Sequence, residues 1–469
     1  MSNSLRLRTA IAAHRFGLGE ASLAALTGDP LEWLDGQIGP GDAPLGDGLL
    51  STGQALKRLT TERELRKQAV MPAPGMTTEQ VLAAQVRETA LADSRSRVLT
   101  AVTTARPFAE RLQLFWANHF TVSLAKGGAR GLVGAFERDA IRPHIAGSFA
   151  TLLVASTTHP AMLRYLDNSQ SAGPNSRAAD RAAKRAVLRN ETPRVTGLNE
   201  NLAREVLELH TLGAESGRGA GNVYTQEDVT SLARVLTGWR VDLQGTDPAQ
   251  VFDSNWHEPG RKTLLGKTYA EGPGALHEVL HDLALHPATA RFIATKLARH
   301  FVADDPPPAL VDRLAATYLR NGAALAPVYR ELIRNPLAWM PQPLKLKTPE
   351  EFVVSTARVL SLATRLFERG SDVNASGMEM LGQRIQTAQS PAGWSDRAGD
   401  WLGPDAVWKR VEWATRVAAR LASTVDARTL AEQSLGPLLG IDTQRQIDRA
   451  ADGPQAVALL LLSPEFQRR

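Results

Sequence analysis

Residues 199–213 read Asn-Glu-Asn-Leu-Ala-Arg-Glu-Val-Leu-Glu-Leu-His-Thr-Leu-Gly, a stretch that carries the signals of one complete amphipathic helix. Asn199 is a favoured N-cap residue, and Gly213 is a favoured residue directly after a helix. The same helical spacing recurs along the chain, whereas runs of alternating Val, Ile and Thr are nearly absent. We therefore predict an all-α protein, a large multi-helix globular array with essentially no β-sheet.

The polar face of this helix carries four charged side chains, which are Glu200, Arg204, Glu205 and Glu208. Glu200, Arg204 and Glu208 have the spacing of a ladder of ion pairs along a helix. The order Glu205-x-x-Glu208-x-His210 resembles a metal motif, but at about 100° per residue Glu208 and His210 point about 160° apart and cannot bind one ion. Glu205 and Glu208 therefore belong either to a cation site completed by other helices or to an ion-pair surface.

His210 falls on the apolar face of its helix, and His119 repeats this arrangement in a second predicted helix. His119 lies in the stretch Phe-Trp-Ala-Asn-His-Phe-Thr at 115–121, directly after Asn118. A buried imidazole needs a hydrogen-bond partner for each ring nitrogen. The two histidines are therefore either hydrogen-bonded core residues or two walls of one polar pocket.

Two polar segments outside these helices are further candidates for a site. The segment 167–171 (Asp-Asn-Ser-Gln-Ser) has the composition of a turn, and such short polar groups also surround ligands. His257 lies in the stretch 255–262, which we interpret as an exposed loop, a common place for functional residues. His277 and His281 flank an apolar stripe, and we interpret them as part of an exposed helix face.

The composition excludes several classes of protein. The 469 residues contain 43% hydrophobic and 22% charged side chains, as is typical of a chain with a full core. The absence of cysteine excludes disulfides, thiolate nucleophiles and cysteine-ligated metals. No apolar run approaches the roughly 20 residues of a membrane-spanning helix, and no secretory signal is visible, so we expect a cytoplasmic protein. The net charge of +5 is small and its basic residues are scattered, so we expect no binding of nucleic acid.

Local signals mark helix starts and loops without dividing the chain firmly. Thr225 and Thr348 each begin a capping-box pattern. Residues 171–193 contain five basic side chains and are predicted to form a basic, mobile insertion. We predict a single domain over 1–469, with at most a sub-boundary near the proline-rich residues 304–308.

Taken together, the motifs resemble those of one family, the bacterial domain of unknown function 1800 family. The matching stretches follow one another over nearly the whole chain: AAHRFGLG at 12–19, FWANHFT at 115–121, YLDNSQS at 165–171, NENLARE at 199–205, ELHTLG at 208–213, YTQEDV at 224–229, LTGW at 236–239, HPATARF at 286–292, PAGW at 391–394 and SPEFQR at 463–468. The resemblance implies a helical bacterial protein without a settled activity, often encoded beside a sulfatase-like partner. Members of the family are often exported, and this chain departs from them because no export signal precedes its first motif.

The motif positions of this resemblance include many polar residues, a pattern that suggests a shared site rather than a solvated surface. They are Asn118, His119, Asp167, Asn168, Asn199, Glu200, Asn201, Arg204, Glu205, Glu208 and His210. A structural polar network is the alternative interpretation of the same residues.

Our first functional hypothesis is a pocket suited to hydrolytic or metal-assisted chemistry. Glu205 or Glu208 would act as general base or cation ligand, His119 and His210 as acid–base groups, and Arg204 would orient an anionic group. The substrate contacts would come from Asn118, Asp167, Asn168, Asn199, Asn201 and His257. The alternative hypothesis is a non-catalytic helical scaffold or partner of a co-encoded sulfatase-like protein. The sequence leaves the cofactor, including any metal, open.

Overall fold

A computed structural model describes residues 3–68, 78–190, 197–217, 222–243, 249–362, 377–421 and 425–469. The chain is 63% helical, which confirms the predicted all-α class. The first eleven helices within these ranges are α1 (Asn3–Ile11), α2 (Pro30–Asp35), α3 (Thr52–Gln68), α4 (Thr78–Thr103), α5 (Pro107–His119), α6 (Val133–Phe136), α7 (Phe149–Thr158), α8 (Pro160–Tyr165), α9 (Arg177–Arg189), α10 (Asn201–Glu205) and α11 (Gln226–Leu236). They are followed by α12 (Pro273–Leu285), α13 (Pro287–Phe301), α14 (Pro308–Arg320), α15 (Leu325–Arg334), α16 (Pro349–Val359), α17 (Pro404–Leu421), α18 (Ala427–Ser434), α19 (Ile441–Asp448), α20 (Gly453–Leu462) and α21 (Pro464–Gln467).

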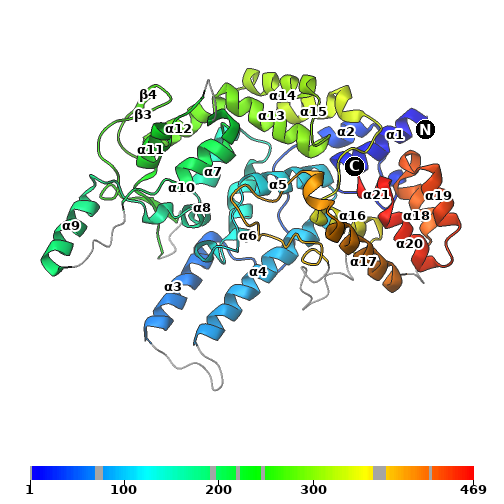
Figure 1. The fold of residues 1–469 in the computed structure, drawn as a ribbon, viewed down its shortest axis with the longest axis horizontal. Helices are drawn as coiled ribbons and strands as arrows, with labels where there is room; N and C mark the ends of the chain where they lie inside the picture. The colour runs from blue at the N-terminus through cyan, green and yellow to red at the C-terminus, as the bar shows by residue number, and fades with distance from the viewer. Residues whose placement is uncertain are drawn as a thin grey trace.

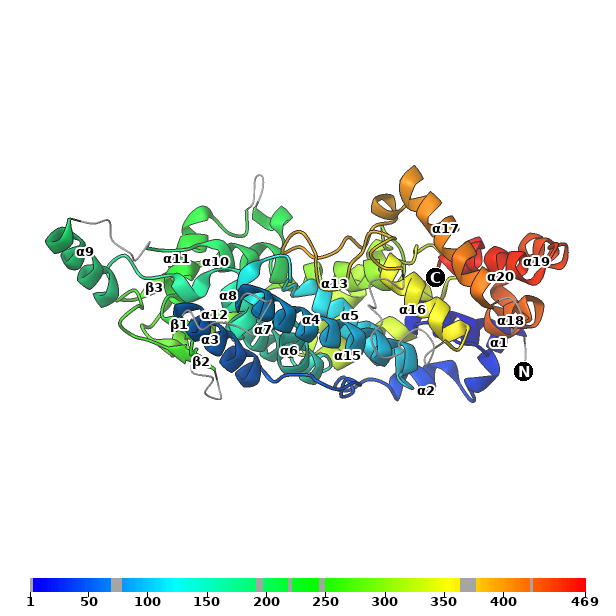
Figure 2. The ribbon, with the colours of Figure 1, turned by 90° about the horizontal axis from the view of Figure 1, so that it is seen from below.

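The helices form an elongated body, with α9 at one end and α18 to α20, beside α1, at the other (Figure 1; Figure 2). The strands within the described ranges make two short antiparallel hairpins. One pairs β1 (Trp239–Val241) with β2 (Gln250–Phe252), and the other pairs β3 (Lys262–Leu264) with β4 (Lys267–Tyr269). None of the helices in the described part is long and apolar enough to cross a membrane.

Helix starts follow the capping signals of the sequence. Thr225 and Thr348 both form reciprocal capping boxes, at α11 and α16 respectively, as predicted. His286 caps α13, because its Nδ1 atom accepts a hydrogen bond from the backbone N–H of Ala288. These local signals therefore determine where three of the longer helices begin.

The helix predicted from Asn199 to Leu212 forms, but it is shorter and not regular, since α10 begins at Asn201 after Glu200 at the N-cap position. The Asn199 side chain accepts a hydrogen bond of 2.9 Å from the Asn201 N–H at its start, and Gly213 after its end has φ +89°. The prediction of a regular α-helix is wrong from Val206 onward, because residues Val206–His210 form a wider π-helical turn. Such turns are rare in proteins overall, but those that occur are frequently found at functional sites. Two others occur in the described chain, at Ala12–Phe16 and Glu137–Ile141.

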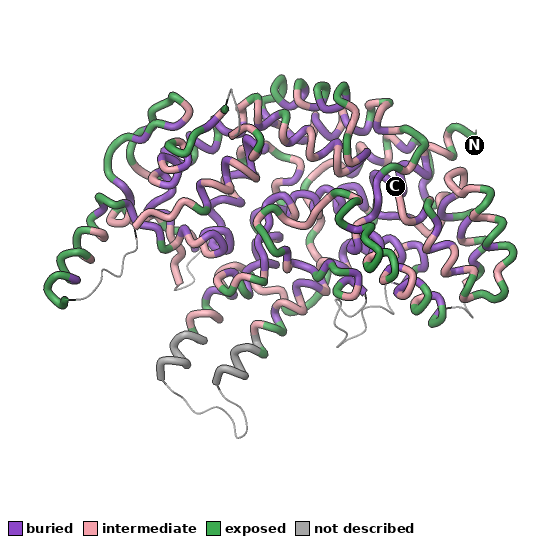
Figure 3. Tube along the Cα trace, viewed as in Figure 1, coloured by how far each residue is buried: buried purple, intermediate pink, exposed green. Residues whose placement is uncertain are grey.

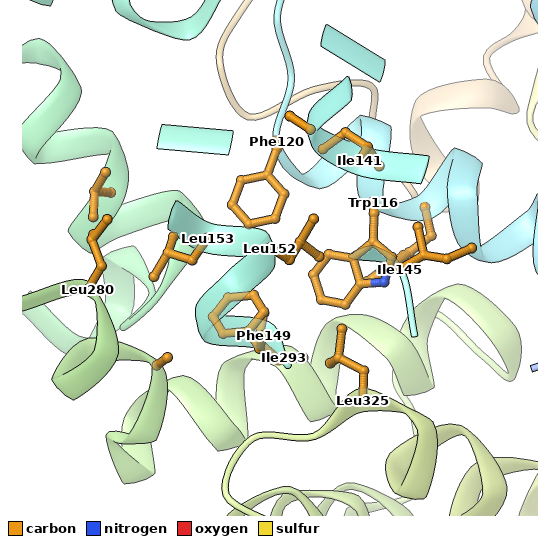
Figure 4. Packing of buried hydrophobic residues seen from close by; sticks show 14 of the residues in the cluster. Trp116, Phe120, Ile141, Ile145, Phe149, Leu152, Leu153, Leu280, Ile293 and Leu325 are labelled. Atoms are coloured by element: carbon orange, nitrogen blue, oxygen red, sulfur yellow. The ribbon is translucent and has the colours of Figure 1, made fainter. Parts of the chain in front are cut away.

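The buried hydrophobic side chains form two clusters. The first contains residues from Ile11 to Ala338 and surrounds Trp116, whose ring lies with those of Phe120 and Phe149 at centroid distances of 5.7 to 6.2 Å (Figure 4). The Trp116 indole N–H donates to the Tyr329 hydroxyl at 2.6 Å, so the largest buried side chain has its polar atom satisfied.

The second cluster lies mainly between residues 352 and 466 and also includes residues of α4. Here the end of the chain returns to the segment before α16. Leu346 and Arg468 form an antiparallel bridge, and the backbones of Lys345 and Arg469 exchange hydrogen bonds of 3.1 and 2.8 Å. This pairing buries the Arg469 side chain completely.

Two predicted features of the organisation can now be placed. Residues 304–307 lie between α13 and α14, residue 308 begins α14, and the residues on both sides belong to the first cluster. The insertion predicted over 171–193 contains the helix α9, whose N-cap is Ser176. The single-domain organisation, the sub-boundary and the mobility of the insertion stay predictions.

Candidate functional site

A cavity of about 240 Å³ lies between the two core clusters. Its walls are α5, α13, the first turn of α16 and the segment 392–397. Its charged and imidazole side chains are Arg97, Arg111, His119, Lys296, Arg299, His300, Glu350, Glu351, Asp396 and Arg397. The cavity is therefore polar although apolar clusters flank it.

Helix α13 contributes three basic residues to one wall, which are Lys296, Arg299 and His300. They lie three and four positions apart and so share one side of the helix. Lys296 forms no ion pair or hydrogen bond in the described part of the chain; its ammonium group lies 5.5 Å from the centre of the Phe292 ring. Burial lowers the pKa of Lys296 to about 8, and Arg299 lowers it further against the opposing effect of Asp396. Lys296 is thus a cation that titrates close to neutral pH.

Another part of the cavity wall consists of charged side chains that form ion pairs with one another. Arg111 binds Glu351 and donates to the backbone oxygen of Gly17 at 2.7 Å, and Arg469 donates to the same carboxylate at 2.6 Å. Burial disfavours the ionised form of Glu351, but the two guanidinium groups outweigh it and hold its pKa far below the usual value. Arg97 is fixed in the same way between Glu350 and Glu137, each at 2.7 Å.

The segment 392–397 forms the loop wall of the cavity, and Asp396 connects it to α13. Asp396 accepts a hydrogen bond of 3.0 Å from His300, and the Lys345 ammonium group lies 3.5 Å away. Burial opposes ionisation of Asp396, but these neighbours outweigh it and lower its pKa. Asp396 is therefore a paired carboxylate.

The balance of charge around the cavity is positive. Five arginine or lysine side chains line it, against three carboxylates. Each carboxylate already has a cationic partner, whereas Lys296 and Arg299 have no ion pair within 4 Å among the described residues. The cavity can therefore hold an anion without breaking an existing ion pair.

Two of the predicted site residues, Asn118 and His119, line this cavity. Asn118 exchanges two hydrogen bonds with the backbone of Trp394, of 2.9 and 2.8 Å, and so fastens the loop wall to α5. His119 is buried, and its Nε2 atom lies 3.1 Å from the backbone oxygen of His210. The structure thus brings both predicted histidines together, with His119 at the cavity and His210 behind it.

The predicted carboxylates occupy a different surface. Arg204 lies between Glu200 and Glu208, at 3.3 and 3.4 Å, which confirms the predicted ladder. Burial and the nearby Glu208 raise the pKa of Glu205. None of these side chains lines the cavity.

Most of the other predicted contact residues have hydrogen-bond or ion-pair partners within the protein. Asp167 forms an ion pair of 2.6 Å with Lys126 in a left-handed turn, and the buried Asn168 donates to two backbone oxygens. Asn201 is exposed. The interpretation of His257 as an exposed loop residue is wrong.

His257 is 4% exposed because its loop folds back onto the end of α11. Its Nδ1 atom lies 2.7 Å from the Thr237 backbone oxygen, and its Nε2 atom lies 3.0 Å from the Lys262 ammonium group. His277 and His281 are exposed on α12, as predicted.

Sequence reasoning missed most of the cavity, including Arg111, Lys296, Glu351 and Asp396. One signal was present, because Lys296, Arg299 and His300 share one side of a helix whose neighbouring positions are apolar. Another was the capping box at Thr348, since its Glu351 also binds Arg111. The remaining contacts join segments far apart in the chain.

Fold and cavity define an all-α protein with a partly buried, cationic polar site. The sequence matches the DUF1800 family model, described as a protein of unknown function, over residues 11–468, and the chain belongs to this family. No curated protein and no solved structure matches the chain. The described residues contain no group of three or more histidine, aspartate or glutamate side chains placed to hold a metal ion.

Proposed function

We propose that this protein binds a small organic anion in the cationic cavity and moves a proton to or from it through Lys296. The anion would carry a carboxylate, phosphate or sulfate group. The observation that carries the proposal is the position of Lys296, a cation on the cavity wall that no carboxylate neutralises within ion-pair distance in the described chain.

Charge and size support this class of ligand. Lys296 and Arg299 can bind an oxyanion, while Arg111 and Arg469 share the single carboxylate of Glu351 and so leave one excess positive charge beside the cavity. The volume of about 240 Å³ lies below the roughly 300 to 1,000 Å³ of pockets for drug-sized ligands. The ligand would therefore be small.

Proton transfer is the chemistry that these side chains support best. A general acid or base works best when its pKa is close to the working pH, and burial lowers that of Lys296 to about 8. Burial lowers the pKa of His119 well below 6.5, so His119 is neutral and serves as a hydrogen-bonding group. We thus propose proton transfer at one anion site in place of the broader hypothesis of hydrolytic chemistry. Glu205 and Glu208 have no role in this proposal. Metal-assisted chemistry, a sulfatase-like partner and a cytoplasmic location stay predictions.

Isothermal titration with inorganic phosphate, sulfate and malonate tests the proposal. We expect at least one anion to bind, with at least about tenfold lower affinity, about 1.4 kcal/mol, in Lys296→Met. Affinity should also fall as the pH rises through about 8, because Lys296 then loses its charge. Arg291→Met is the matched control, since Arg291 lies on the same helix but is exposed and paired with Asp312.

Equal affinities in Lys296→Met and Arg291→Met would contradict the proposal. So would the absence of binding by all three anions at millimolar concentration. A labelling experiment tests the titration separately: acetic anhydride should modify Lys296 at lower pH than an exposed lysine such as Lys184.

A further inference from the structure

Helix α9 projects from one end of the molecule, in both views of the ribbon (Figure 1; Figure 2). Its base is held firmly. The Ala178 N–H donates to the Asn255 backbone oxygen at 2.8 Å, and Arg181 donates to the Asn255 side chain at 2.9 Å. Beyond this base only Ala186 is buried, and most of the helix is exposed (Figure 3).

The net charge of the protein is concentrated on this helix. Its 13 residues contain five basic side chains and one acidic side chain, which gives a net charge of +4. The whole chain has a net charge of +5, so all other residues together contribute +1. Outside this helix the chain contains 49 basic and 48 acidic residues, so their charges nearly cancel.

The basic side chains of α9 also repel one another. Arg177, Arg181, Arg185 and Arg189 follow at intervals of four residues, which places like charges side by side on one face. Like charges at this spacing destabilise a helix. None of the five basic residues forms an ion pair within the described part of the chain. An acidic surface outside the molecule would relieve this repulsion.

Two apolar side chains stand at the free end of the same helix. Val187 is 82% exposed and Leu188 is 86% exposed, more than any other large hydrophobic side chain in the described ranges. Burial of such side chains against an apolar surface is favourable, because it removes them from water. A phosphate backbone offers no such surface, which favours a protein over a nucleic acid.

A membrane surface fits the helix less well. The face opposite the arginines consists mainly of alanine, and Leu188 lies among the basic side chains at helical spacing. Insertion of Leu188 into lipid would carry Arg177 and Arg181 with it. Membrane-surface helices instead carry large apolar side chains on the face opposite their charges.

We propose that α9 is a docking helix for a partner protein whose surface is acidic and carries a small apolar patch. The charges would steer and orient the partner, and Val187 and Leu188 would be buried on contact. This inference is independent of the cationic cavity. It needs only the exposed helix and its anchored base.

Fluorescence anisotropy with defined probes tests this proposal on the full chain. The main probe is a fluorescein-labelled peptide of glutamate and leucine, and an all-glutamate peptide, a DNA duplex and phosphatidylserine vesicles are compared with it. We expect the mixed peptide to bind more tightly than the all-glutamate peptide. Charge reversal by Lys184→Glu, Arg185→Glu and Arg189→Glu should weaken it at least tenfold, and Val187→Ser with Leu188→Ser severalfold.

The matched control reverses three exposed arginines on other elements, by Arg261→Glu, Arg320→Glu and Arg420→Glu. The control should leave peptide binding within twofold of the wild type. The proposal would be overturned if the mixed peptide did not bind, or if the control variant lost as much affinity as the charge-reversed helix. It would also be overturned if DNA or vesicles bound more tightly than the peptide and replacement of Val187 and Leu188 left that binding unchanged. Lys296→Met should leave peptide binding unchanged, so failure here and failure of the anion site are distinguishable.

Discussion

The Nε2 atom of His119 lies 3.1 Å from the backbone oxygen of His210, a residue 91 positions later in the chain. A carbonyl oxygen only accepts, so Nε2 carries the proton and Nδ1 presents a lone pair. Nδ1 of His119 and both ring nitrogens of His210 are buried without a hydrogen-bond partner in the described residues. Burial lowers the pKa of His210 to about 3 and that of His119 well below 6.5. Both imidazoles are therefore neutral in the folded protein.

Neutral buried histidines predict a loss of stability in mild acid. His14 and His210 both have a pKa of about 3 in the fold, whereas their ordinary value is 6.5. Below 6.5 the unfolded chain binds protons that the folded chain does not, so falling pH favours unfolding. Each of the two should contribute about 1.4 kcal/mol per pH unit. Urea unfolding at a series of pH values from about 6.5 to 5 measures this slope before the carboxylates titrate.

Replacement of one such histidine should reduce that slope. His210→Leu removes one proton-binding group and should lower the slope by about 1.4 kcal/mol per pH unit. His277→Leu is the control, because His277 is exposed on α12 and its removal should leave the slope unchanged. An unaltered slope in His210→Leu would show that His210 is protonated in the fold.

Loss of the carboxylate between Arg111 and Arg469 should destabilise the protein strongly. Glu351→Gln would leave two buried guanidinium groups together, and breaking a buried pair costs about 3 to 5 kcal/mol. Glu331→Gln removes a carboxylate that pairs with the exposed Arg313, and should cost no more than about 1 kcal/mol. Equal losses of unfolding free energy in denaturant would refute the structural role of Glu351.

A methyl group at Gly393 should open the loop wall of the cavity. Gly393 has φ +81°, and a Cβ atom there would lie 2.5 Å from the Asn118 backbone oxygen. Gly382 has a similar φ of +91° but no atom within 4 Å of such a Cβ. Both alanine variants should lose about 1 to 2 kcal/mol from backbone strain. Only Gly393→Ala should lose more, together with anion affinity in titration calorimetry.

Two lysines near each other in the chain should respond in opposite ways to replacement by methionine. Lys345 binds Asp304 at 2.6 Å, and Lys345→Met would leave two carboxylates short of a partner, at a cost of about 3 kcal/mol. Lys347 donates to the Ser355 hydroxyl at 2.7 Å, and burial lowers its pKa well below 10.5. Below about pH 10.5 the unfolded chain protonates Lys347, whereas burial in the folded protein disfavours the protonated form.

Lys347→Met should therefore raise the free energy of unfolding at pH 7 by about 1 kcal/mol, because it removes that cost. Thermal and urea unfolding of the two variants at one pH makes the comparison. A loss in Lys347→Met as large as that in Lys345→Met would contradict a cost of burying the Lys347 ammonium group.

The elements were predictable because their signals are local. The capping residues Thr225 and Thr348, and the ends of the helix at Asn199 and Gly213, are decided within a few residues of the chain. The π-helical turn at 206–210 was not predicted. A single wider turn leaves no mark in a pattern with a period of about 3.6 residues.

The sequence by itself determined the fold class and the family, because helical periodicity, caps and short motifs are properties of neighbouring residues. Only the tertiary structure decided which polar groups share a cavity. Lys296 of α13, Arg111 of α5, Glu351 of α16 and Asp396 of the loop come from four separate segments. A charge becomes a paired anchor or a free ligand-binding group according to the partner that packing places beside it, and that partner is not a neighbour in the chain.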